Sequence, residues 1–305
     1  MRELVKKITV ILIIISIFMV TFLISLPVDN NNIYESLLDK HSYIVESEEK
    51  NIIIIGGSNV LMGIDSELIE ENLEYKVVNM GINAGLGLRF MLNDIKNYIK
   101  EGDIVVIASE YAHYFGKLNG ESALLFLFKQ LPSEVKYISK EQIPILIESI
   151  PYFIRCQITG IIKGMEADEI QNRQQLNKNG DLISHLDKKS IEITGWSKKI
   201  GNIELDTFNV LNKFNMYAKS KGARVVISYP SLYDEVYYDW KEGIQELDTL
   251  LRNETDIPVI SDYNNYKFSK NEMYDSIYHL NGVGRERRTK QLIDDLNQYI
   301  NYENR

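Results

Sequence analysis

Residues 51–59 read Asn-Ile-Ile-Ile-Ile-Gly-Gly-Ser-Asn, and this stretch decides the fold. Four consecutive branched apolar residues are typical of a strand that is buried on both faces of a parallel sheet. Gly56 and Gly57 permit an abrupt turn directly after the strand. Ser58 follows at the mouth of that turn, where a side chain can face a ligand instead of the core.

Strand and helix patterns alternate along the chain that follows this stretch. The predicted strands are 51–55, 76–79, 104–108, 224–228 and 258–260, and the predicted helices are 66–73, 88–99, 206–221, 240–251 and 285–300. This alternation predicts an α/β fold of three layers, α/β/α, around a mainly parallel five-stranded sheet. Ligands of such sheets bind beyond the carboxyl ends of the strands, which is where Ser58, the loop 81–87 and Glu110 stand.

A long segment, about residues 112–203, interrupts the alternation. It is too long for a simple connection, so we expect a helical insertion with a structure of its own. Its part 143–162 is strongly apolar, but two prolines and two charged residues interrupt it. These residues favour a helix that caps the domain or lies on a surface over a second transmembrane span.

The N-terminal residues 1–28 have the pattern of a membrane anchor. Residues 8–26 carry no charged side chain and are long enough to cross a bilayer as a helix. Three basic residues precede them and Asp29 follows, which predicts a cytoplasmic N-terminus and an extracytoplasmic remainder. A cleaved signal peptide is the alternative, but no small-x-small cleavage site ends the apolar stretch. Residues 29–50 are expected to form a polar linker to the domain 51–305.

The composition argues against several classes of function. A net charge of −9 over 305 residues argues against nucleic acid as a partner, because phosphates require a basic surface. Cys156 is the single cysteine, so the chain has no disulfide framework, and its apolar surroundings favour a structural role. No zinc-ligand spacing is present, and we expect neither a metal nor a cofactor. An exported chain without disulfides fits a Gram-positive bacterium.

The four histidines lie in different sequence contexts. His41 lies in the expected linker and is predicted to be inert, and His185 in the insertion is predicted to be structural. His113 follows the third strand, where it could face the site. His279 has Asp275 four residues before it, a spacing that places both side chains on one face of a helical turn.

This Asp–His pair and the presented serine together suggest a catalytic triad. An Asp that holds one imidazole nitrogen fixes the tautomer and leaves the other nitrogen to take a proton from a serine. Ser58 is therefore the candidate nucleophile, His279 the candidate base and Asp275 the acid that orients it.

Three blocks of the sequence share a pattern with one family of hydrolases. Residues 56–59 read Gly-Gly-Ser-Asn, residues 78–85 read Val-Asn-Met-Gly-Ile-Asn-Ala-Gly, and residues 274–281 read Tyr-Asp-Ser-Ile-Tyr-His-Leu-Asn. They resemble the first, second and last blocks of the SGNH/GDSL hydrolases. The resemblance covers the α/β core, implies a flavodoxin-like arrangement of its layers, and leaves the anchor and the insertion unassigned.

The resemblance also implies roles for individual residues. Ser58 corresponds to the nucleophile of the family, His279 to the base and Asp275 to the orienting acid. The backbone N–H groups of Ser58 and of Ala84 or Gly85 correspond to the oxyanion hole, which holds the negative charge that develops on the substrate oxygen.

The family pattern has two departures in this sequence. The acid of the last block usually stands three residues before the histidine, whereas here the separation is four. The third block usually supplies an Asn side chain to the oxyanion hole, but Glu110 follows the third strand instead. Glu110 either holds a loop or contacts substrate, and Asn59, Asn83 and His113 are further positions that could face the substrate.

The family chemistry and the anchor together predict an extracytoplasmic serine acyltransferase that O-acetylates hydroxyl groups of cell-envelope polymers or exopolysaccharide. Ser58 would carry the acyl group, and a membrane-bound O-acyltransferase is the expected partner. One alternative is an extracytoplasmic carbohydrate esterase or deacetylase, or a protein that handles D-alanyl esters of teichoic acid. Another alternative is a non-catalytic surface module that keeps the fold and binds a ligand.

Overall fold

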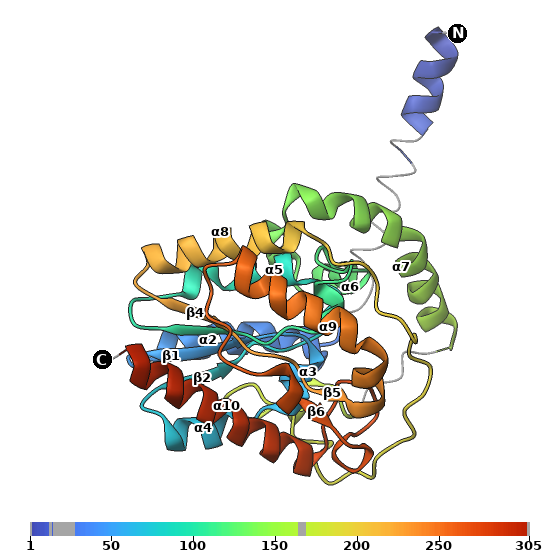
Figure 1. Ribbon diagram of the computed structural model, residues 1–305. Helices are drawn as coiled ribbons and strands as arrows, with labels where there is room; N and C mark the ends of the chain where they lie inside the picture. The colour runs from blue at the N-terminus through green and yellow to red at the C-terminus, as the bar shows by residue number, and fades with distance from the viewer. Residues whose placement is uncertain (1, 12–13, 15–27, 164–168, 304–305) are drawn as a thin grey trace.

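The computed structural model describes residues 2–11, 14, 28–163 and 169–303. Its centre is a sheet of four parallel strands in the order β2-β1-β3-β4. These strands are β1 (Asn51–Ile55), β2 (Lys76–Asn79), β3 (Ile104–Ile107) and β4 (Arg224–Ile227). Helices flank the sheet (Figure 1), so the predicted α/β/α fold is confirmed. Because β1 pairs with both β2 and β3, the turn that follows it lies in the middle of one sheet edge.

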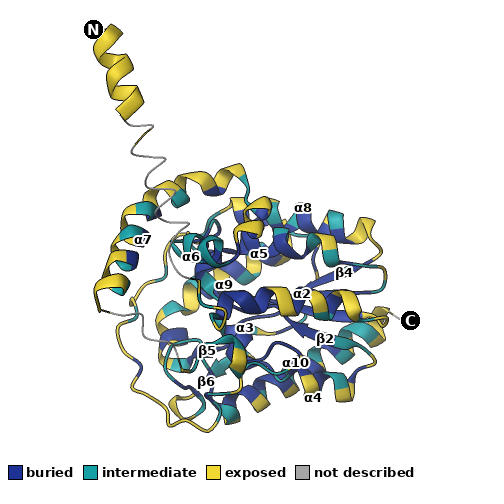
Figure 2. Ribbon diagram, turned by 180° about the vertical axis from the view of Figure 1, so that it is seen from behind, coloured by how far each residue is buried: buried dark blue, intermediate teal, exposed yellow. Residues whose placement is uncertain are grey.

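Alternate side chains of each strand point to opposite faces and so belong to two separate cores. Ile53 and Ile55 pack into the larger core, whereas Ile52 and Ile54 pack into the smaller one. The larger core lies under α2 (Ser36–Glu46), α5 (Leu88–Ile95), α8 (Asp206–Ser220) and α9 (Asp234–Glu254), and the smaller under α4 (Ser66–Asn72) and α10 (Gly282–Glu303). Figure 2 shows the buried strands between helices whose outer sides are exposed.

The predicted fifth strand, 258–260, is reduced to a single bridge. Val259 pairs in parallel with Ile227 at the outer edge of β4, through hydrogen bonds from Ile227 N to Pro258 O and from Ile260 N to Ile227 O. Proline has no N–H to donate to a ladder, so the pairing stops there. The sheet was predicted to have five strands and has four, so this part of the prediction was wrong. A small parallel pair, β5 (Leu232–Tyr233) and β6 (Lys267–Phe268), was not predicted.

The predicted polar linker, 29–50, was wrong. This segment forms a short 3₁₀ helix, η1 (Ile33–Glu35), and then α2, and Leu37 and Ile44 are each 2% exposed in the larger core. The apolar residues of α2 are spaced so that they lie on one side of the helix. The segment also contains many polar residues, so its overall composition resembles that of a linker. Residues 2–11 are helical, and most of the predicted span 8–26 lies outside the described residues.

The described part of the insertion between β3 and α8 has two α-helices, and its residues 169–203 return to the domain with little regular structure. The helices are α6 (Ala123–Gln130) and α7 (Ile143–Lys163). The return passes into the core beside the short helix that follows β1, because Leu182 N donates to Leu61 O, at 2.9 Å. Short 3₁₀ helices complete the chain: η2 (Ala84–Leu86), η3 (Lys96–Tyr98), η4 (Tyr111–His113), η5 (Pro132–Tyr137), η6 (Lys140–Gln142), η7 (Arg173–Gln175), η8 (Tyr263–Asn265) and η9 (Lys270–Glu272).

One helix in the described part of the chain is long and apolar enough to cross a membrane, over Lys140–Lys163. It packs on α6 through Phe153, whose ring meets that of Phe126 edge-on at 4.9 Å. Its outer face nevertheless exposes large apolar side chains, namely Ile143, Ile147, Tyr152, Ile158, Ile161 and Ile162.

Candidate active site

The turn at Gly56–Gly57, named the nucleophile turn after the role predicted for Ser58, joins β1 to the short helix α3 (Ser58–Gly63), and Ser58 is half-buried at the start of this helix. The turn requires glycine because its neighbours are close. A methyl group on Gly57 would lie 2.5 Å from the Ala84 nitrogen and 2.5 Å from Glu110 Oε1. The loop that follows β2 therefore packs directly against the residue before the serine.

Glu110, which follows β3, holds this turn from inside the protein. Its carboxylate accepts hydrogen bonds from Gly57 N at 2.9 Å and from Asn59 N at 3.1 Å. It is 1% exposed, so its predicted role in holding a loop is confirmed and a position facing substrate is wrong. The two bonds leave the intervening Ser58 N–H, which has no hydrogen-bond partner among the described residues.

Asn59 was predicted as a position that could face the substrate, and this was wrong. Its side chain is buried and donates from Nδ2 to Ala108 O at 3.1 Å. Arg288 of α10 donates to Asn59 O at 2.6 Å and to Asn59 Oδ1 at 2.7 Å. Burial lowers the pKa of this guanidinium to about 10, which still leaves it charged at neutral pH. A buried cation thus supports the turn, and no motif near Arg288 in the sequence indicates this role.

Of the two N–H groups that were candidates for the oxyanion hole in the loop after β2, Gly85 N–H is paired and Ala84 N–H is not, among the described residues. Asn83 Oδ1 accepts from Gly85 N at 2.8 Å, and His113 Nε2 lies 2.8 Å from Ala84 O. A carbonyl oxygen can only accept, so this His113 nitrogen carries the proton. Both polar groups of the Ala84–Gly85 peptide are therefore occupied. This excludes Gly85 as an oxyanion donor, whereas Ala84 N–H has no partner in the described chain.

His113 was also predicted to be able to face the site, and this was wrong. The ring is fully buried, and Nδ1 lies 3.7 Å from Glu110 Oε2. His113 therefore connects the loop after β3 to the loop after β2. Its contribution to the site is to fix the orientation of the Ala84 carbonyl.

The Asp–His pair forms as predicted, although not on a helical turn. Asp275 Oδ1 lies 2.7 Å from His279 Nδ1. The residues between them form a bend, closed by Tyr274 N donating to His279 O at 2.8 Å. This closure brings the two ends of the loop together, so a separation of four residues still allows the contact. The side chains of Asp275 and His279 are 31% and 13% exposed.

The loop that carries His279 is fixed to the same sheet edge as Ser58. Tyr233 N donates to Ile277 O at 2.9 Å, and Ser231 Oγ donates to Tyr278 O at 2.7 Å. Ser231 also contacts Arg288, the residue that holds the nucleophile turn. Ser58 Oγ and His279 Nε2 are not hydrogen-bonded to each other in this structure, and catalytic hydrogen bonds are often long without substrate.

His185 has the structural role predicted for it. Its ring is buried, packs near Tyr274 with centroids 5.6 Å apart, and Nε2 lies 3.1 Å from Met62 O. Burial lowers its pKa to about 4, so the ring is neutral above that pH. His185 thus ties the insertion to both α3 and the loop of His279.

Lys40 of α2 supports the loop after β2 and was missed because its segment was interpreted as a linker. Its ammonium donates to Gly81 O at 2.5 Å and to Gly180 O at 3.1 Å. Burial lowers its pKa to about 7. A neighbouring buried carboxylate, Asp181, binds Ser66, Asn79 and Arg285.

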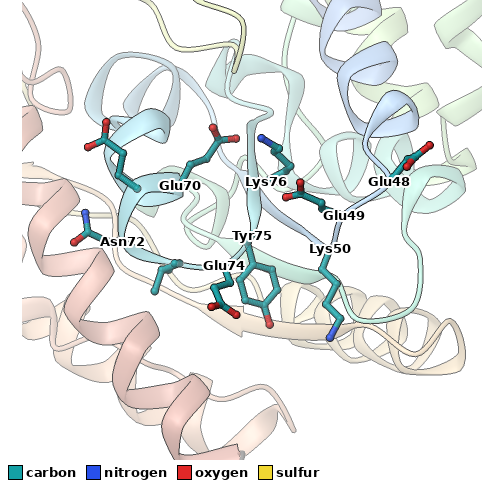
Figure 3. A pocket seen from close by; sticks show the side chains of 10 residues that line it. Glu48, Glu49, Lys50, Glu70, Asn72, Glu74, Tyr75 and Lys76 are labelled. Carbon is teal, nitrogen blue, oxygen red and sulfur yellow. The ribbon is translucent and has the colours of Figure 1, made fainter.

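Two hollows lie at opposite ends of the sheet. The larger, about 830 Å³, lies beside the starts of β1 and β2 and far from Ser58 in the fold; five glutamates dominate its lining (Figure 3). The smaller, about 370 Å³, borders β5, which holds the loop of His279. Trp196 and Tyr233 meet edge-on in its wall, with ring centroids 5.8 Å apart. This hollow is joined to the loop of His279 through Tyr233, whose N–H donates to Ile277 O.

The ends of β1, β2 and β3 thus meet at one edge of the sheet, where the loops after β2 and β3 contact the turn that carries Ser58. Comparison with models of known protein families finds no match for this chain, and neither does comparison with curated proteins.

Proposed function

We propose that this protein transfers acyl groups through Ser58, as in the SGNH/GDSL hydrolases that its three sequence blocks resemble. The observation that carries the proposal is a pair of unpartnered backbone donors. The N–H groups of Ser58 and Ala84 remain available, while Glu110, Asn83 and His113 bind the groups around them. Two such donors beside a presented serine match what a tetrahedral acyl intermediate requires.

The reaction would begin with proton transfer from Ser58 Oγ to His279 Nε2, while Asp275 holds Nδ1 and stabilises the charged ring. Oγ attacks the carbonyl carbon of an acyl donor, and the resulting oxyanion accepts from Ser58 N–H and Ala84 N–H. The tetrahedral intermediate expels the donor's leaving group, which takes the proton from His279. An acceptor hydroxyl then loses its proton to His279, and its oxygen attacks the acyl carbon. The bond to Ser58 Oγ breaks, Oγ takes the proton back from His279, and the acylated acceptor leaves.

Asn83 is the candidate for the side-chain donor that the family pattern otherwise lacks. Its Oδ1 accepts from Gly85 N, which fixes the amide plane. Its Nδ2 makes no hydrogen bond to the described residues, and the side chain is half-buried. We propose that this NH₂ group donates to the same oxyanion, in place of the missing Asn after β3.

The smaller hollow favours a sugar as the acceptor and hence a transferase. Half-buried Trp196 provides aromatic surface, backed by the buried ring of Tyr233, and Glu192, Glu235 and Lys270 provide hydrogen-bonding groups beside it. A polyhydroxylated ring combines C–H faces with hydroxyl groups, which is the complement of such a lining. We propose that the acceptors are cell-envelope polymers or exopolysaccharide, which become O-acetylated. A membrane-bound O-acyltransferase is the proposed partner that supplies the acetyl group.

We also propose that the domain sits against the outer face of the cell membrane of a Gram-positive bacterium, with residues 8–26 spanning it and the N-terminus in the cytoplasm. The described domain begins beside the insertion, because Asp29 N donates to Gln130 Oε1 of α6 at 3.3 Å. The exposed apolar face of α7, which packs on α6, would then lie in the lipid interface.

The test is acyl transfer by the full chain in detergent, with p-nitrophenyl acetate as donor and an oligosaccharide as acceptor. We expect acetylated sugar from wild type, none from Ser58→Ala, and unchanged product from Ser220→Ala, an exposed serine on α8. Trp196→Ala should raise KM for the sugar and leave release of p-nitrophenol intact. Free acetate alone would indicate the esterase, and turnover that persists in Ser58→Ala would refute both catalytic functions.

A further inference from the structure

Three side chains that can bind a metal ion lie together in a buried cluster outside the Ser58 site. His41 comes from α2, Asp94 from α5 and Glu134 from η5, and they are 5%, 3% and 2% exposed. One ligand atom from each lies within 4.8 Å of the other two. His41 Nε2 and Asp94 Oδ2 are 3.0 Å apart.

Two carboxylate oxygens of this cluster are buried without a hydrogen-bond partner, namely Asp94 Oδ1 and Glu134 Oε2. The other Glu134 oxygen accepts from Ser133 Oγ at 3.0 Å, and the exposed Lys136 ammonium is 4.0 Å from it. A buried carboxylate without compensation is costly. The cluster therefore needs a cation or a shared proton.

We propose that His41, Asp94 and Glu134 bind a divalent transition-metal ion, with Zn²⁺ as the best match. One imidazole nitrogen and two carboxylate oxygens suit Zn²⁺ or Mn²⁺ better than Ca²⁺ or Mg²⁺, which prefer oxygen ligands only. Bonds of about 2.0–2.2 Å place ligand atoms about 3–4 Å apart, so small side-chain rotations complete the site.

The surroundings of the cluster suit a metal ion. The ring of Tyr98 stacks on that of His41, with centroids 4.2 Å apart and an interplanar angle of 17°, and so fixes its orientation. A hollow of about 390 Å³, lined by His41, Glu134 and Tyr98, gives an entry path and room for a water ligand. The ion would pin α2 to the domain, which makes its role structural and independent of the proposed acyl transfer.

The first experiment measures binding by the full chain in detergent after chelation and dialysis. Zn²⁺ is added, excess ion is removed, and bound metal is counted by mass spectrometry. We expect a single ion per chain and an unfolding midpoint that rises with Zn²⁺ and falls with chelator. Asp94→Asn and Glu134→Gln should lose both effects, and Glu141→Gln, an exposed neighbour on η6, should keep them.

A second measurement does not depend on the variants folding. Wild type loaded with Co²⁺ should show visible absorption bands that Zn²⁺ displaces. The proposal is overturned if wild type retains no stoichiometric ion, or if bound ion persists in folded Asp94→Asn. The proposal is equally overturned if Glu134→Gln is more stable than wild type and Zn²⁺ changes the unfolding midpoint of neither protein. That result would mean that Asp94 and Glu134 share a proton in wild type.

Discussion

Replacing Glu110 with Gln tests the central structural argument about the nucleophile turn. Both carboxylate oxygens of Glu110 are in use, one on Gly57 N and one on Asn59 N. Gln offers a single acceptor oxygen, so its NH₂ group would face one of these N–H donors. The variant also removes a negative charge that raises the pKa of the buried Arg288.

The magnitude of the effect follows from these contacts. Hydrogen bonds to charged groups contribute about 1.5–3 kcal/mol each, and an unsatisfied buried N–H costs about 1–3 kcal/mol. Losing one bond and weakening the other should lower the free energy of unfolding by about 2–4 kcal/mol. For a domain of this size the melting midpoint should fall by about 5–15 °C. Displacement of Ser58 N–H should also lower kcat by about 10–100-fold.

The assay is urea unfolding of the full chain in detergent, followed by tryptophan fluorescence, with acyl transfer measured on the same preparation. Glu121→Gln is the matched control, because its side chain is 46% exposed and, among the described residues, pairs with Lys117 alone at the surface. That control should change stability by less than about 0.5 kcal/mol. A Glu110→Gln protein as stable as the control, with wild-type kcat, would refute the role of the carboxylate.

Three further predictions concern the same loops. Lys40→Met removes a titrating group, because burial lowers the pKa of Lys40 from 10.5 to about 7. Between these two pH values the unfolded wild-type chain binds a proton that the folded chain lacks. The stability of wild type therefore rises with pH in this range. In urea unfolding from about pH 7.5 to about pH 9.5, the stability difference between Lys40→Met and wild type should change by about 1.4 kcal/mol per pH unit; parallel curves contradict this. Gly57→Ala should cost about 1–3 kcal/mol, because its methyl group meets Ala84 N and Glu110 at 2.5 Å; Gly201→Ala, with no neighbour inside 3.5 Å, is the control. Asn83→Ser keeps an oxygen for Gly85 N and loses the NH₂ donor, so kcat should fall about 10²–10³-fold at constant stability; an unchanged kcat excludes Asn83 from the oxyanion hole.

The fold was predictable wherever burial left a pattern in neighbouring residues. The apolar run of β1 and those of β2, β3 and β4 mark strands that are buried on both faces, and all four formed. The segment 258–260 has the same apolar character, but pairing on one side only and a proline limit it to one bridge. The helix α2 was missed because its buried face includes Lys40 and His41, which composition counts as polar.

The candidate site was predictable for residues that act locally. Ser58 was found from its glycine turn and the Asp275–His279 pair from its spacing, and this pair is in contact. The direction of a side chain in a loop at a strand end depends on loops that are distant in sequence. Glu110 and His113 lie at such an end, and nothing in their neighbours shows that both turn inward.

The inward-facing residues nevertheless point to the site by elimination. A buried polar group must find a partner, so Asn59, Glu110 and His113 each bind the backbone of a neighbouring loop. Two of these partners, Gly57 N and Asn59 N, lie on either side of the Ser58 N–H, and another is the carbonyl of Ala84. The N–H groups of Ser58 and Ala84 themselves remain unpaired in the described chain. A backbone N–H group that has no hydrogen-bond partner, while its polar neighbours all have one, is available to donate to a ligand. The same rule, applied to Asp94 and Glu134, leads to the metal site under α2.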